Sequence, residues 1–212
     1  IATANVVELV GAKPIFIDID IDTFNIDVTQ IESKITPKTK AIIPVHEFGL
    51  ACDIKKVCEI ATKHNIYVIE DAACDETFVG SFGIAGSFSF HPRKSITSGE
   101  GGIVTTNDIE LAKKIKQLRN HGIDPNNSQM DFVVAGYNYR MTDIQAALVN
   151  SQMSRFDDIL AQKNELAQLY FTEITNSKIK LPSVPIDRNH TWQTFHILLD
   201  DSLDQSQIIN YF

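Results

Sequence analysis

The chain has 212 residues, which is enough for one large domain or two small domains with a sizeable core. Its 19 Lys and Arg against 27 Asp and Glu leave a formal net charge of −8, which argues against nucleic acid or an anionic membrane surface as the main partner. No apolar run reaches the roughly 18 residues of a membrane-spanning helix. Because the sequence begins on Ile1 rather than Met, we expect an N-terminal segment to be missing from it.

The elements of the first 70 residues alternate between two periodicities. Strand-like apolar runs are separated by segments of helical length, and this order is typical of βαβ units with a mostly parallel sheet that is covered by helices on both faces. Aspartates that precede amphipathic segments mark the two helix starts. The predicted elements are strands at 14–19, 40–46 and 66–70, a short helix capped by Asp27, and a helix capped by Asp53 that runs to His64.

After this part the sequence changes character. Six of the ten glycines fall between Gly80 and Gly102, so some segment there needs backbone freedom or close approach. We expect a large α/β domain over residues 1–170 and the beginning of a small C-terminal α+β domain over residues 171–212. The further elements predicted are strands at 87–90, 102–106 and 195–199, a helix from 107 or 108 to 119, a polar loop at 124–129, a long helix at 142–170, a linker at 180–188 and a helix that starts in 200–212.

The cysteines are three in number and have no metal-ligand spacing. Cys52 and Cys58 are six residues apart, Cys74 stands alone, and no CxxC occurs. Free thiols in a reduced cytoplasmic protein are the simplest interpretation, and we expect no metal site.

Two ionisable residues are candidates for chemistry. Asp71 follows the predicted strand 66–70, and ligands of open α/β sheets bind beyond the carboxyl ends of the strands. Lys94 lies in a short link between two predicted strands, where its side chain can point into a cleft. Taken singly, Asp71 is more often a helix cap and Lys94 a solvated surface residue.

A lysine, a strand-end carboxylate and Ser89 on the preceding strand suit pyridoxal phosphate (PLP). The lysine amine condenses with the aldehyde of this cofactor, and the carboxylate keeps the pyridine nitrogen protonated, which makes the ring an electron sink. At about 4 Å and an effective dielectric constant near 20, that ion pair is worth roughly 4 kcal/mol. Hydroxyl and backbone N–H groups near Ser89 would hold the phosphate.

Longer motifs point the same way. The chain resembles the DegT/DnrJ/EryC1/StrS family, whose members are PLP-dependent aminotransferases of nucleotide-linked sugars with the fold type I architecture. The form of the lysine motif is closest to perosamine-synthase-like members. The resemblance runs from Ile1 to about Tyr170 and rests on the stretches Gly11–Asp20, Thr36–His46, Val68–Ala73, Gly80–Lys94, Gly99–Gly102 and Gly136–Asp143.

The resemblance implies roles for individual residues. Asp71 matches the aspartate on the pyridine nitrogen, Lys94 the lysine that holds the cofactor and shuttles the substrate proton, and Ser89 a phosphate-binding serine. Asn138 matches an asparagine that reaches the phosphate in the neighbouring subunit's site, which implies a homodimer with shared sites. Arg140 ends the same motif, and either an ion pair within the structure or a substrate contact would explain it.

Three positions are less regular. Many members carry Gln or His where this chain has Cys74, placed to hydrogen-bond the phenolic oxygen of the cofactor, and a thiol is a weaker donor. His46 lies at a strand end and is either a substrate contact or a satisfied structural histidine. The same two interpretations apply to His91.

The leading hypothesis is an aminotransferase that moves an amino group from glutamate to a nucleotide-linked keto-deoxy sugar, for surface polysaccharide or amino-sugar synthesis. One alternative is a PLP-dependent sugar dehydratase of the same family; those enzymes carry histidine in place of the lysine, so the presence of Lys94 disfavours it. The other is a non-catalytic PLP-binding homologue that serves as a sensor or subunit.

Overall fold

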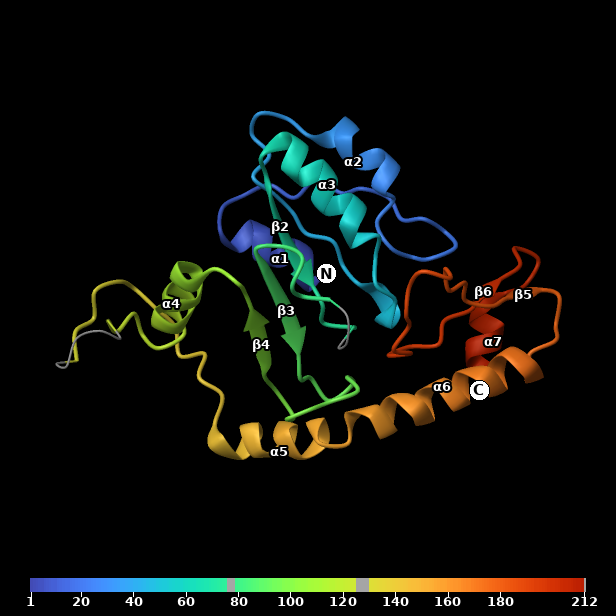
Figure 1. Ribbon diagram of the computed structural model, residues 1–212. Coiled ribbons are helices and arrows are strands. Elements are labelled where there is room, and N and C mark those ends of the chain that lie inside the picture. Colours follow the sequence, from blue (N-terminus) through green and yellow to red (C-terminus); the bar gives the residue numbers. More distant parts are fainter. Residues whose placement is uncertain (76–78, 125–129, 212) are drawn as a thin grey trace.

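The central sheet is mostly parallel, as predicted. The computed structural model describes residues 1–75, 79–124 and 130–211, and in these residues four strands form the sheet in the order β1-β2-β3-β4. Strand β2 pairs in parallel with both β1 and β3, whereas β4 runs antiparallel to β3 (Figure 1). The strands are β1 (Ala41–Ile42), β2 (Tyr67–Asp71), β3 (Ala85–Ser89) and β4 (Gly102–Thr105).

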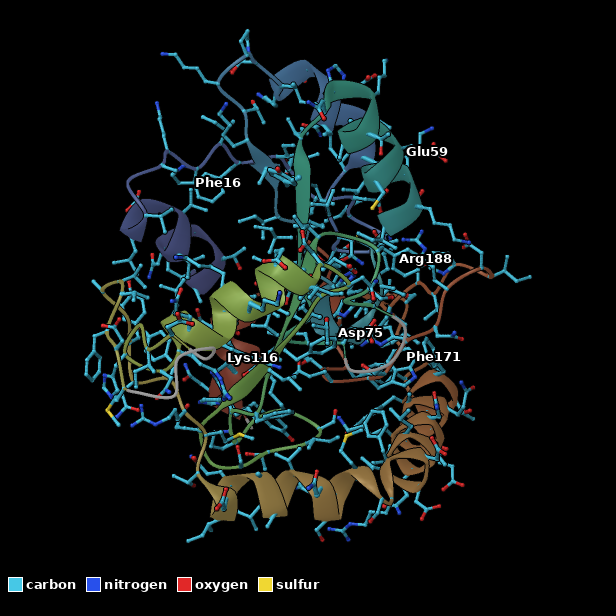
Figure 2. The ribbon with its side chains drawn as sticks, turned by 60° about the vertical axis from the view of Figure 1, so that its left-hand side comes forward. Phe16, Glu59, Asp75, Lys116, Phe171 and Arg188 are labelled. Atoms are coloured by element: carbon cyan, nitrogen blue, oxygen red, sulfur yellow. The ribbon has the colours of Figure 1, made fainter. Side chains whose placement is uncertain are left out.

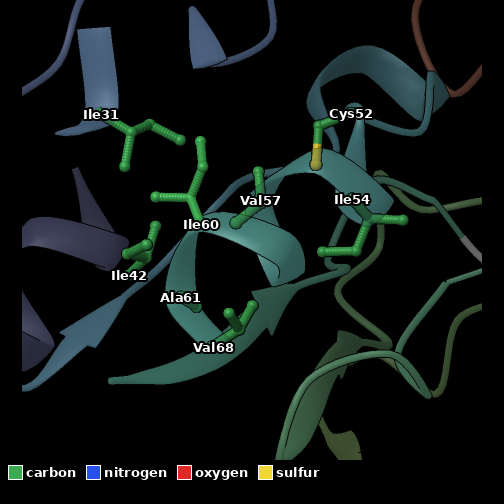
Figure 3. Close-up of a cluster of buried hydrophobic side chains, with 8 residues drawn as sticks. All are labelled: Ile31, Ile42, Cys52, Ile54, Val57, Ile60, Ala61 and Val68. Atoms are coloured by element: carbon green, nitrogen blue, oxygen red, sulfur yellow. The ribbon is translucent and has the colours of Figure 1, made fainter. Parts of the chain in front are cut away.

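Helix α3 (Ile54–His64) forms where its caps predict it. The Asp53 carboxylate accepts a hydrogen bond from the backbone N–H of Lys56, and Asn65 ends the helix in the left-handed region at φ 53°. The apolar face of the helix packs against β1 and β2 and builds the main core (Figure 3). The buried members of this core are Ile31, Ile42, Cys52, Ile54, Val57, Ile60, Ala61 and Val68.

The alternation of side chains along β2 sets up two different faces of the sheet. Val68 belongs to the core beneath α3, so Glu70 faces the same side and Asp71 the opposite one. On the side of Asp71 lies α1 (Ala2–Leu9), whose Thr3 contacts the aspartate, and α2 (Val28–Lys34) packs on α3. Helices therefore cover both faces, as predicted.

The predicted strand at 14–19 is wrong. Within it only Ile19 makes a ladder contact, as an isolated antiparallel bridge with Ile26. The carboxylates of Asp18 and Asp20 accept hydrogen bonds from nearby backbone N–H groups, those of residues 19, 22 and 23. These hydrogen bonds use backbone N–H groups that a strand would need for pairing, and Pro14 has no backbone N–H to donate to a neighbouring strand.

The predicted long helix at 142–170 is two helices. Helix α5 (Asp143–Met153) begins with a capping box formed by Thr142 and Gln145, and α6 (Phe156–Glu173) follows after a break. Ser154 donates its hydroxyl to the carbonyl of Ser151, and Arg155 leaves the helical region at φ −126° and ψ 24°. A serine that bonds back to the preceding turn bends helices, and here it coincides with the break.

Figure 2 shows Phe16 of the N-terminal loop and Phe171 of α6 on opposite sides of the molecule. None of the helices that the structure describes is long and apolar enough to span a membrane. The predicted strand at 195–199 is shorter than expected, since only Leu198 and Leu199 form a strand. The predicted loop at 124–129 lies outside the described residues from position 125 on. The other elements are η1 (Glu47–Gly49), α4 (Ile109–Leu118), β5 (Ile179–Lys180), β6 (Leu198–Leu199) and α7 (Gln205–Tyr211).

Candidate active site

Asp71 and Ser89 lie on the same face of the sheet, near the carboxyl ends of neighbouring parallel strands. Asp71 is the last residue of β2 rather than the first residue after it, and it pairs with Ser87 of β3. Ser89 is two residues beyond Ser87 and therefore points to the same side as Asp71. The sheet thus places a carboxylate and a hydroxyl on one face at a sheet edge where α/β proteins bind ligands.

Both oxygens of the Asp71 carboxylate are held by hydrogen bonds. Thr3 of α1 donates its hydroxyl to Oδ2 at 2.6 Å, and the backbone N–H of Ala73 donates to Oδ1 at 3.1 Å. These two donors fix the plane of the carboxylate while each oxygen keeps a lone pair for a ligand. Reasoning from the sequence missed Thr3, because 68 residues separate it from Asp71 and no local signal links them.

Lys94 lies next to the turn that follows Asp71. Its backbone N–H donates to the carbonyl of His91, and its Nζ lies 3.1 Å from the Sγ of Cys74. Burial raises the pKa of the Cys74 thiol, although the neighbouring ammonium of Lys94 acts in the opposite direction. Since Cys74 follows Asp71 by three residues, this contact brings the amine and the carboxylate into one region.

His46 is completely buried and has both ring nitrogens engaged. The backbone N–H of Cys52 donates to Nδ1 at 3.1 Å, so Nε2 carries the proton and donates to Glu70 at 3.2 Å. Of the two interpretations left open for His46, this geometry favours the structural histidine.

Glu70 is the adjacent carboxylate on β2, and it lies fully buried on the other face of the sheet. Burial opposes its ionisation, but the hydrogen bond from His46 and those from three backbone N–H groups outweigh this and lower its pKa. The three backbone donors belong to Gly80, Phe82 and Gly83, at 2.7 to 2.8 Å.

The other predicted site residues lie in local contacts. His91 accepts a hydrogen bond on Nδ1 from the backbone N–H of Arg93. Arg140 is exposed and donates from Nη1 to the side chain of Asn120 at 2.9 Å, and Asn138 is exposed and bridges to the same residue through its backbone. No contact within the described residues joins Asn138 or Arg140 to Asp71 or Lys94.

The donor set fits PLP. An amine, a carboxylate and a hydroxyl come from the ends of two parallel strands and the loop between β3 and β4, and they match the aldehyde, the ring nitrogen and the phosphate of that cofactor. The fold and the site together define the class of α/β transferases that bind PLP.

The sequence profile of the DegT/DnrJ/EryC1/StrS aminotransferase family matches residues 1–212, and the chain belongs to this family. It is 40% identical over 215 residues to the GDP-perosamine synthase of Caulobacter vibrioides, with 98% of this chain and 58% of that protein covered. It is 37% identical to the spore coat polysaccharide biosynthesis protein SpsC of Bacillus subtilis, with 94% of this chain and 56% of that protein covered. The chain therefore spans less than three fifths of these relatives.

A solved structure agrees in fold. The crystal structure of NtdA from Bacillus subtilis, described with bound cofactor PMP, superposes with a TM-score of 0.90 at 33% sequence identity. The superposition covers 99% of this chain and 49% of that one.

Proposed function

We propose that the protein is an aminotransferase that moves an amino group from glutamate to a nucleotide-linked keto-deoxy sugar. The observation that carries this proposal is the position of Lys94 Nζ, 3.1 Å from Cys74 and beside the turn that follows Asp71. The names of the two relatives, a perosamine synthase and a spore coat polysaccharide protein, support surface polysaccharide or amino-sugar synthesis as the purpose.

Each residue of the site has a separate role in this proposal. Lys94 would hold the aldehyde carbon of PLP, Asp71 the pyridine nitrogen and Ser89 the phosphate, and the bound ring supplies an electron sink. When its amine is free, Lys94 Nζ would move a proton between the substrate carbon and the cofactor. Thr3 and Ala73 fix the plane of the Asp71 carboxylate, which would keep the ring nitrogen protonated. Cys74 faces the same region and offers a weak donor to the phenolic oxygen.

We propose two domains and a partner subunit for the protein. We place residues 1–170 in the large PLP-binding domain and residues 171–212 at the start of a small domain, and the separate two-stranded sheet of β5 and β6 supports that division. We also propose a homodimer in which Asn138 reaches the partner's site. The exposed, mutually stacked rings of Tyr137 and Tyr139 on either side of Asn138 support an interface there. The free cysteines support a cytoplasmic location.

The first test is spectroscopic. The protein incubated with PLP should show a visible absorbance band that Lys94→Ala abolishes, whereas Lys116→Ala, at an exposed lysine of α4, should keep it. A band that survives Lys94→Ala contradicts the assignment of the lysine.

The second test is chemical. With glutamate and a panel of nucleotide-linked keto sugars, the protein should form 2-oxoglutarate and an amino sugar that mass spectrometry detects. Cofactor binding without 2-oxoglutarate would instead favour a PLP-binding subunit or sensor, and loss of water from the sugar would favour a dehydratase.

A further inference from the structure

The loop from Phe90 to Ser98, which carries Lys94, is closed at its base and anchored on a helix far along the chain. The carbonyl of Phe90 accepts hydrogen bonds from the backbone N–H of Ser98 and the hydroxyl of Thr97. Ile96, only 2% exposed, packs with Phe90 and with Val149 of α5. The shape of the loop therefore depends on a helix that begins about fifty residues later in the sequence.

Gln152 extends this anchor with polar contacts. It lies three residues after Val149, on the same face of α5. Its Oε1 accepts from the backbone N–H of Thr97 at 3.0 Å, and its Nε2 donates to the carbonyl of Thr97 at 2.7 Å. The second hydrogen of Nε2 reaches the carbonyl of Leu148 at 2.8 Å, so the amide is held in one orientation. One side chain thus satisfies both backbone groups of a loop residue.

The two residues that flank Lys94 are also tethered by later segments of the chain. Lys163 of α6 donates from Nζ to the hydroxyl of Ser95 at 2.7 Å and to the carbonyl of Trp192 at 3.2 Å. Gln193 donates from Nε2 to the carbonyl of Arg93 at 3.1 Å. Figure 1 shows the loop between β3 and β4 lying along α5, where α5 leads into α6.

We propose that Gln152, Lys163 and Gln193 are positioning residues, which hold the loop on both sides of Lys94 and so aim its amine. The inference rests on the proposed function, in which Lys94 holds the cofactor. A lysine has a long flexible side chain, so the position of Nζ is only as well defined as that of the backbone that carries it. A catalytic group displaced by about 1 Å loses much of its effect. All three side chains come from segments after residue 150. Lys163 also bonds to the carbonyl of Trp192, and Gln193 bonds to Arg93, so the segment at residues 192–193 is linked to the loop that carries Lys94.

The experiment compares Gln152→Ala and Lys163→Met with two matched controls, Gln162→Ala and Lys114→Met, whose side chains are exposed. For each purified protein, three quantities are measured: the dissociation rate of PLP, the pH at which its visible absorbance band titrates, and the thermal unfolding temperature. Because Gln152 makes two hydrogen bonds to Thr97, we expect PLP to dissociate about tenfold faster from Gln152→Ala, with a shifted titration of the band. Lys163→Met should show the same changes to a smaller extent, and both controls should match the wild type.

The outcomes separate this inference from the proposed function. If the wild type shows no visible band with PLP, the proposed function fails. If the wild type has the band but both Gln152→Ala and Lys163→Met titrate and release PLP like their controls, the positioning role is overturned, even where their unfolding temperatures are lower. Should Gln152→Ala fail to fold, Lys163→Met decides the question by the same measurements, because Lys163 is half-buried and its methylene stem is retained.

Discussion

Glu70 and Asp71 are consecutive carboxylates on one strand, and the fold gives them opposite surroundings. Glu70 has no exposed surface and receives four hydrogen bonds, one from His46 and three from the backbone that leads into β3. Asp71 points to the other face, is half-buried, and receives two hydrogen bonds, from Thr3 and Ala73.

The comparison separates a structural carboxylate from one that is available to a ligand. Each oxygen of Glu70 already accepts two hydrogen bonds, so neither can accept a ligand, whereas each oxygen of Asp71 accepts one. Substitutions at the two positions should therefore change different properties of the protein.

The largest effect is expected for Asp71→Asn. Loss of the charge removes an ion pair worth roughly 4 kcal/mol at about 4 Å, so PLP should bind about a hundred- to a thousandfold more weakly. The free energy of unfolding should change by no more than about 1 kcal/mol, since the amide can still accept a hydrogen bond. Absorbance titration with PLP and denaturant unfolding measure the two quantities, and unchanged PLP affinity would argue against a ring contact by Asp71.

Glu70→Gln should instead lower the free energy of unfolding more than it weakens the binding of PLP. Whichever way the amide is turned, its NH₂ group meets two N–H donors that the carboxylate oxygen satisfied. We expect the free energy of unfolding to fall by about 3 kcal/mol, since buried donors are left unpaired. The control Glu59→Gln, at an exposed position of α3 (Figure 2), should cost at most about 1 kcal/mol. Equal stability of the two variants would contradict the role assigned to Glu70.

The same carboxylate predicts a dependence on pH. The pKa of Glu70 is lower in the folded protein than its ordinary value of 4.5, so the unfolded chain takes up the proton first as pH falls. The stabilisation is complete above about pH 4.5 and is lost as pH drops through the lower folded pKa. In unfolding curves, the difference between wild type and Glu70→Gln should therefore shrink below pH 4.5, and a constant difference would exclude this linkage.

Thr3→Val should give the smallest effect. It removes the hydroxyl that orients Asp71 at nearly constant volume, and one hydrogen bond of about 1 kcal/mol corresponds to about fivefold weaker PLP binding. Thr3→Ser keeps the hydroxyl and should bind PLP like the wild type. If both variants bind PLP equally well, Thr3 does not position the carboxylate.

Local signals predicted the elements whose stability is local. Asp27, Asp53 and Asp108 cap helices where the sequence places them, because a capping carboxylate needs only the backbone N–H groups two or three residues further on. The apolar runs of β2 and β3 were found in the same way. The strand at 14–19 and the unbroken helix at 142–170 were wrong, because an apolar pattern does not show that side chains such as Asp18, Asp20 and Ser154 take up backbone groups.

By itself, the sequence determined the α/β class, the family and the pairing of Asp71 with Lys94 as candidate site residues, because these are carried by periodicity, caps and contiguous motifs. Only the tertiary structure decided which face of β2 each carboxylate occupies, that His46 is buried against Glu70, and that Thr3 contacts Asp71 and Gln152 contacts Thr97 from remote helices. These contacts join residues between 24 and 68 positions apart, and no local pattern encodes a hydrogen bond across such separations.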